Sequence, residues 1–143
     1  MVVVGWEEEL IRAKYHFSVA GRLYDNYAKF SEKRLLVGVI NEMAKATSKI
    51  IRAYLIYAKK RRLRDFVEIV SKQYLDSETA GNLMKTLEIQ KAQSVSPVQF
   101  AKNDKIIMLI GEKWKILTVS RLGEFLNSIK TAINVFPRKF RQV

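Results

Sequence analysis

The chain has 143 residues, no cysteine, one histidine and a formal net charge of +12. The lack of cysteine excludes disulfides and thiolate metal sites, and a single histidine cannot supply a structural zinc site. Apolar residues make up 48% of the sequence, so we expect residues 1–143 to form a single domain with a buried core.

The first two predicted elements are long amphipathic helices. Apolar residues recur at alternating steps of three and four over residues 6–27 and again over 36–57. Only a helix, with 3.6 residues per turn, places such positions on one side. We therefore expect helices over about 6–30 and 32–62, broken near Ser31 and packed antiparallel because their connection is short.

Shorter helices are predicted in the middle of the chain. Residues 63–75 carry an apolar side typical of a helix, and 78–93 form the next helical segment. Asp76 between them supplies N-cap chemistry. The run ending at Pro97 is predicted to be a loop.

A β-hairpin is predicted over residues 105–117. The run 105–110 is rich in residues that favour strands, Gly111 suits a type II′ turn, and residues 113–116 alternate polar with apolar. A helix over 119–136, with Thr118 as its N-cap, then completes the fold. The sequence thus predicts a mainly α protein, an antiparallel bundle of about five helices with a small β-hairpin before the last one.

The register of the hairpin predicts which side chains share a face. A two-residue turn pairs Leu109 with Trp114 and Ile107 with Ile116. Because an isolated two-stranded ribbon is only marginally stable, we expect this face to lie on the helices or on another subunit. The strand 106–110 is apolar on both faces, which predicts a homodimer of twofold symmetry.

The sequence predicts a soluble, cytoplasmic protein. No window reaches the roughly 18 uncharged apolar residues of a membrane span. The first nine residues lack the basic region and long apolar run of a secretory signal.

Positive charge is concentrated in two segments. Residues 31–64 hold ten basic and two acidic residues, and residues 105–143 hold eight and two. Such asymmetry attracts polyanions. The candidate nucleic-acid-binding residues lie on the second helix and at its end: Lys45, Lys49, Arg52, Lys59, Lys60, Arg61, Arg62 and Arg64. The alternative interpretation is a solvated helix terminus, where cations complement the helix dipole.

Motifs for catalysis or for a cofactor are absent from the sequence. It has no glycine-rich phosphate loop and no metal-ligand pattern, so we expect neither a metal nor a cofactor. His16 lies four residues after Arg12, on one helix face, and such a pair could serve a ribonuclease. The alternative is a histidine packed at the helix edge, and we expect no catalytic residue and no enzyme activity.

Two segments resemble the HEPN superfamily of helical nucleotide-binding domains. They run over residues 6–24 and 39–56, with an acidic start, a stripe of small residues and then a helix carrying Ala44, Ala46 and Ala53. The resemblance implies a helical bundle that is often dimeric and associated with RNA or nucleotides. Active members carry, late in the domain, an arginine and a histidine separated by four to six intervening residues, whereas Arg12 and His16 have three between them and lie in the first helix. Arg121 has no such histidine here, so the resemblance implies a non-catalytic member.

Two functional classes follow from these observations. The first is a non-catalytic HEPN-like protein that binds RNA or other nucleic acid through its basic surface. The second is a structural or protein-interaction domain, such as an adaptor or antitoxin-type partner, which binds an acidic protein and no nucleic acid.

Overall fold

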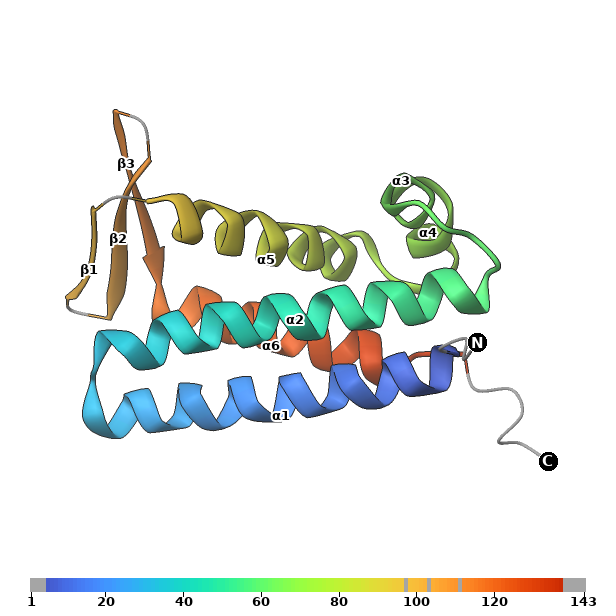
Figure 1. Cartoon of the computed structure of the whole chain (residues 1–143), viewed down its shortest axis with the longest axis horizontal. Helices are drawn as coiled ribbons and strands as arrows, with labels where there is room; N and C mark the ends of the chain where they lie inside the picture. The colour runs from blue at the N-terminus through green and yellow to red at the C-terminus, as the bar shows by residue number, and fades with distance from the viewer. Residues whose placement is uncertain (1–4, 97, 103, 111, 138–143) are drawn as a thin grey trace, which may run out of the picture.

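The computed structural model describes residues 5–96, 98–102, 104–110 and 112–137, without the side chains of 98–102 and 110. Four long helices pack side by side, and they are α1 (Trp6–Phe30), α2 (Lys33–Tyr57), α5 (Ser77–Val95) and α6 (Val119–Asn134). A small antiparallel sheet lies at the end of the bundle where α1 turns into α2, and short helical segments lie at the opposite end (Figure 1). The predicted mainly α bundle, with an antiparallel strand pair before the last helix, is confirmed. In the part of the chain described, no helix is long and apolar enough to cross a bilayer.

Helix α1 has the bounds that its apolar pattern predicts. It ends because Ser31 takes the left-handed conformation, with φ 52°, and donates its backbone N–H to the Tyr27 carbonyl at 2.9 Å. Helix α2 then returns antiparallel along α1 after a two-residue connection. A methyl group added at Gly38 would lie 2.9 Å from Leu23 Cδ1, so the two helices approach each other closely there.

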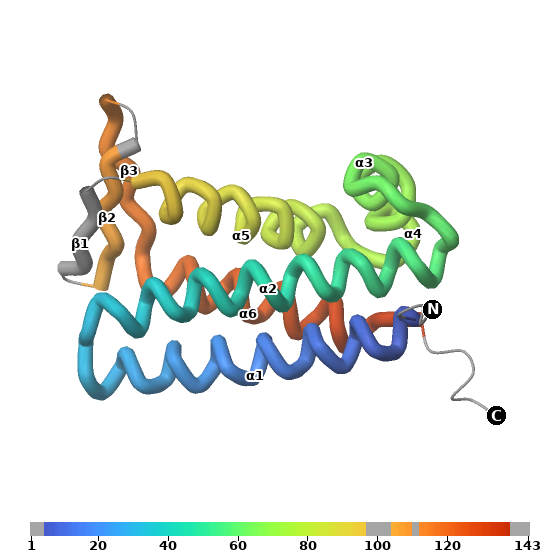
Figure 2. The backbone as a smooth tube through the Cα atoms, in the orientation of Figure 1, coloured from blue at the N-terminus to red at the C-terminus, as the bar shows by residue number. Residues whose placement is uncertain are grey.

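Helix α2 ends at Tyr57, five residues before the predicted end, so the expectation of a helix to residue 62 is wrong. After α2 the chain turns away toward α3 (Figure 2). Lys59, in this turn, has a left-handed φ of 59°. The Lys60 N–H reaches the Leu55 carbonyl at 2.8 Å, and the Lys59 N–H reaches the Ile56 carbonyl at 3.1 Å. These two bonds form a Schellman motif, which satisfies the last carbonyls of the helix. Glycine is the usual signal for this motif, and a lysine gives no such signal.

The predicted helix over 63–75 contains a wider turn. Its parts are α3 (Leu63–Asp65), the π-helical η1 (Phe66–Val70) and α4 (Ser71–Tyr74). The Ser71 N–H bonds to the Phe66 carbonyl five residues back, and its hydroxyl donates to the Val67 carbonyl at 3.0 Å. The serine side chain thus takes up the carbonyl that the π turn leaves without its usual partner.

The starts of α5 and α6 follow the predicted capping chemistry. Asp76 Oδ1 accepts the Thr79 N–H at 2.6 Å, and this backbone hydrogen bond lowers the pKa of the Asp76 carboxyl. Thr118 Oγ1 accepts the Arg121 N–H at 3.2 Å. Helix α6 ends at Asn134, two residues before the predicted end.

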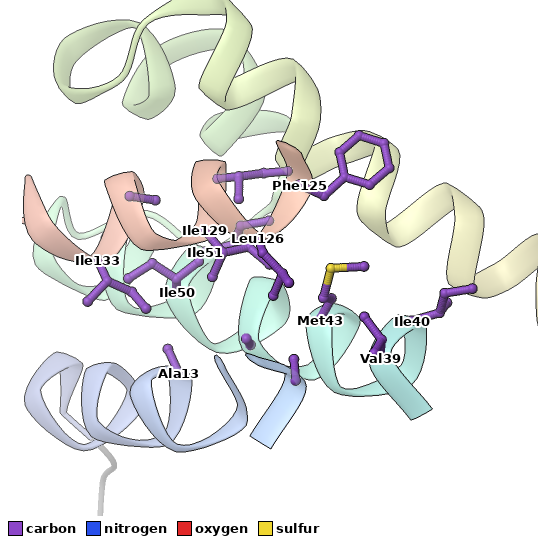
Figure 3. Close-up of a cluster of buried hydrophobic side chains, with 14 of the residues drawn as sticks. Ala13, Val39, Ile40, Met43, Ile50, Ile51, Phe125, Leu126, Ile129 and Ile133 are labelled. Atoms are coloured by element: carbon purple, nitrogen blue, oxygen red, sulfur yellow. The ribbon is translucent and has the colours of Figure 1, made fainter. Parts of the chain in front are cut away.

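The core is built mainly from α2 and α6, with small residues of α1 beneath them. Figure 3 shows Ala13 of α1 facing the aliphatic side chains of α2 and α6. Tyr54 is fully buried, and its hydroxyl donates to the Ala132 carbonyl at 2.7 Å, which ties α2 to α6. An aromatic cluster around Tyr54 includes Phe66 and Phe136, so the short helical segments are held on the same core.

The sheet has three strands where the sequence predicted two. Strands β1 (Val98–Lys102), β2 (Lys105–Ile110) and β3 (Lys113–Thr118) form an antiparallel sheet in the order β1-β2-β3. The predicted register of the hairpin is confirmed, since Leu109 pairs with Trp114 and Ile107 with Ile116. Strand β1 was not predicted.

The helices cover the face of the sheet opposite to the one that carries Trp114 and Ile116. Ile106, Met108 and Leu117 are buried, whereas Trp114 is 55% exposed and Ile116 is 61% exposed. Strand β3 runs directly into α6, so Leu117, next to the junction, faces the bundle. Strand β2 is apolar on both faces, and its alternation therefore does not reveal which face is buried. Of the two alternatives for the Trp114 face, packing on the helices is therefore wrong, and packing on another subunit stays a prediction.

Candidate nucleic-acid interface

Three of the predicted cations form a row along α2. Lys45, Lys49 and Arg52 are spaced by four and three residues, which places them on one side of the helix. Each of them has an acidic neighbour. Lys45 Nζ lies 3.1 Å from Glu42 Oε2, and Lys49 Nζ and Arg52 Nε lie 3.9 and 2.8 Å from Glu9 Oε2. Part of the positive charge of this row is therefore neutralised by the protein's own Glu42 and Glu9.

Glu9 lies at the centre of an ion cluster with Arg12, Lys49 and Arg52. Its side chain is only 1% exposed, and Arg12 of the same helix donates to Glu9 Oε1 at 3.2 Å. The contact from Arg52 to Oε2 is an ion pair without the alignment of a hydrogen bond. Three cations thus surround one buried carboxylate, and the contacts from Lys49 and Arg52 connect α2 to α1.

The densest predicted cations lie in the connection between α2 and α3 and at the start of α3. All five are exposed: Lys59, Lys60, Arg61, Arg62 and Arg64. Within the described ranges, no ion pair or side-chain hydrogen bond joins any of them to an acid. Because α2 ends early, residues 59–62 form an irregular connection rather than the last turn of a helix, and Arg64 lies in α3. Their charges are available to solvent without an internal competitor.

The structure brings the row and the connection together at one hollow. Arg52 from α2 and Lys60 and Arg61 from the connection line a hollow of about 260 Å³ over Leu55 and Ile56. The Schellman turn produces this arrangement, because it folds Lys60 back toward the last turn of α2. Residues eight or nine positions apart in the chain thereby converge on a single surface site.

His16 has a partner that the sequence did not reveal. Its Nδ1 donates to Glu42 Oε1 at 3.0 Å, and Glu42 also accepts from Lys45. Burial acts to raise the pKa of the Glu42 carboxyl, but the hydrogen bonds from His16 and Lys45 outweigh it, and the pKa is lowered. Arg12 pairs with Glu8 and Glu9 instead of joining His16.

The aromatic residues near the basic segment belong to the core. Tyr54 is fully buried, and Tyr57 packs edge-on against Trp6 and Phe136. Trp114 is exposed, but it lies on the sheet at the other end of the bundle. Base stacking on these rings is therefore no part of the basic site. The described residues also contain no group of three or more histidine or acidic side chains placed to hold a metal ion.

Comparison with known proteins adds no assignment. The chain matches no protein-family model, no curated protein and no solved structure.

Proposed function

We propose that this protein is a non-catalytic, HEPN-like cytoplasmic helical protein that binds RNA or another nucleic acid through its basic surface. The observation that carries the proposal is the exposed run of residues 59–64, whose five cations have no acidic partner in the described structure. Lys45, Lys49 and Arg52 extend this surface along α2. Lysine and arginine side chains of this kind bind phosphates and release the counterions condensed on them.

Binding of this kind is expected to depend little on base sequence. Phosphate contacts fix position and supply affinity, whereas sequence is read by groups that reach base edges in a groove. The basic connection is an irregular exposed segment, and its neighbouring aromatic rings are packed in the core. We therefore expect similar affinities for single-stranded RNAs of equal length and different sequence.

The affinity of the wild-type protein for a single-stranded RNA at different salt concentrations tests this function. Phosphate binding is expected to weaken steeply between about 50 and 200 mM salt, because each neutralised phosphate contributes to the slope. A His16→Ala variant is expected to bind as tightly as wild type, and wild type is expected to leave the RNA uncut. Absence of binding at 50 mM salt would refute the function, and cleavage lost on the His16 change would show an enzyme.

A protein-interaction function is the second candidate. It is favoured by the outer face of the sheet, where Trp114 and Ile116 are more than half exposed. Ile107 and Leu109 pair with them in the register and are partly exposed. Burial of this face against a second copy of the chain would give the expected homodimer. Recovery of one acidic protein and no nucleic acid in a pulldown would favour the alternative of an acidic partner.

A further inference from the structure

The eight cations of the proposed surface are not equivalent. Five lie in the segment 59–64 without an acid, but Arg52 and Lys49 contact the buried carboxylate of Glu9. Arg52 is the only one of the eight that both contacts Glu9 and lines the hollow with Lys60 and Arg61. An anion in that hollow would therefore share Arg52 with Glu9.

From this geometry we infer that Glu9 is an internal competitor for bound phosphate and sets the affinity of the basic surface through Arg52. The inference rests on the proposed function. It deepens that function, because it assigns the hollow as a phosphate subsite and names Glu9 as the residue that weakens phosphate binding there.

The accessibility of the two partners supports this assignment. The side chain of Arg52 is 61% exposed, whereas that of Glu9 is 1% exposed. A phosphate can therefore reach the guanidinium from solvent while the carboxylate stays covered. Arg52 contacts Glu9 through Nε, and a guanidinium has two further nitrogens that can donate to another anion.

Glu9 keeps a partner when Arg52 turns toward a phosphate. Arg12 holds the other carboxylate oxygen at 3.2 Å, and Lys49 lies 3.9 Å away. A buried carboxylate is costly only when it is left without a counterion. When Arg52 moves from Glu9 to phosphate, the buried Glu9 carboxylate therefore keeps a counterion.

The direct test compares Glu9→Gln with Glu7→Gln in RNA binding. Both changes remove one negative charge from the first turn of α1, but Glu7 is exposed and lies outside the ion cluster. Glu9→Gln is expected to bind single-stranded RNA more tightly and to steepen the salt slope by about half a unit, because one cation contributes at most about one unit and Arg52 contributes only part of it in wild type. Its gain over wild type would then be about twofold larger at 50 mM than at 200 mM salt. Glu7→Gln is expected to bind nearly as wild type does.

Each outcome of this test has a distinct meaning. If wild type binds and Glu9→Gln binds no more tightly than Glu7→Gln, the competitor role is wrong and the proposed function stands. If wild type does not bind at 50 mM salt, the proposed function itself fails.

A second pair of variants keeps the inference testable should Glu9→Gln not fold. Arg52→Ala removes the cation shared with the hollow, and Arg12→Ala removes one that contacts Glu9 but does not line the hollow. Arg52→Ala is expected to lower the salt slope by about half a unit, the share that Arg52 contributes in wild type, and Arg12→Ala by clearly less. Equal losses would overturn the assignment of the subsite.

Discussion

The connection after α2 and the outer face of the sheet lie at opposite ends of the bundle and differ in kind (Figure 1). The first exposes five cations over residues 59–64, and the second exposes Trp114 and Ile116. Contacts made by exposed charges weaken as salt screens them, whereas contacts made by apolar burial do not. Binding at the two surfaces, as proposed, can therefore be distinguished by its dependence on ionic strength.

The largest effect is expected from Ile116→Lys at the sheet. Placing a charge on this face is expected to weaken a homodimer by tenfold or more, since burial of an isoleucine is worth about 1.5–3 kcal/mol. The change should leave the salt slope of RNA binding unaltered, because the basic connection lies at the other end. Sedimentation at tens of micromolar and an RNA titration measure the two properties.

The matched control for this prediction is Ile11→Lys on α1. Ile11 is 65% exposed, close to the 61% of Ile116, but it lies on a helix rather than on the sheet. This variant is expected to keep the wild-type association state. If the wild-type protein sediments as a monomer, the prediction of a homodimer is wrong. Met108 is unsuitable for such a test because it is buried against the helices.

A smaller effect, on the free energy of unfolding, is expected at the pair of His16 on α1 and Glu42 on α2. The pKa of Glu42 is lowered in the folded protein, so its charge stabilises the fold above the unfolded value near 4.5, and this stabilisation is lost as pH falls through the folded value. Glu42→Gln is expected to lower the free energy of unfolding at pH 7 by about 1 kcal/mol or less. Denaturant unfolding at pH 7 and pH 3 should show the difference from wild type shrinking in acid, and a difference that grows in acid would contradict the assignment.

The sequence predicted the elements whose signals are local. The bounds of α1, the caps at Asp76 and Thr118 and the hairpin register follow from periodicity, capping chemistry and turn length. The end of α2 could not be predicted in this way, because Lys59 takes a conformation that usually selects glycine. The π turn at 66–70 and strand β1 likewise lack a local signal and depend on tertiary packing.

The candidate site was predicted in composition but not in its pairing. The basic residues are visible in the sequence, whereas Glu9 and Glu42 become partners of Lys49 and His16 only through the antiparallel register of α1 and α2. These two pairs are seven residues apart on both helices, so one register explains both. That register depends on the geometry of the connection at Ser31, which propensity alone does not determine.

The most direct test of the central claim compares two triple variants in RNA binding between about 50 and 200 mM salt. The first variant removes three charges from the basic connection by changing Lys60, Arg61 and Arg62 to Ala. The second removes three exposed charges from the sheet by changing Lys105, Lys113 and Lys115 to Ala. The account predicts that the first variant loses affinity at low salt and flattens the salt slope by up to about three units, while the second changes it little. Equal losses in both variants, or an unchanged slope in the first, would contradict the claim that the connection after α2 binds phosphate.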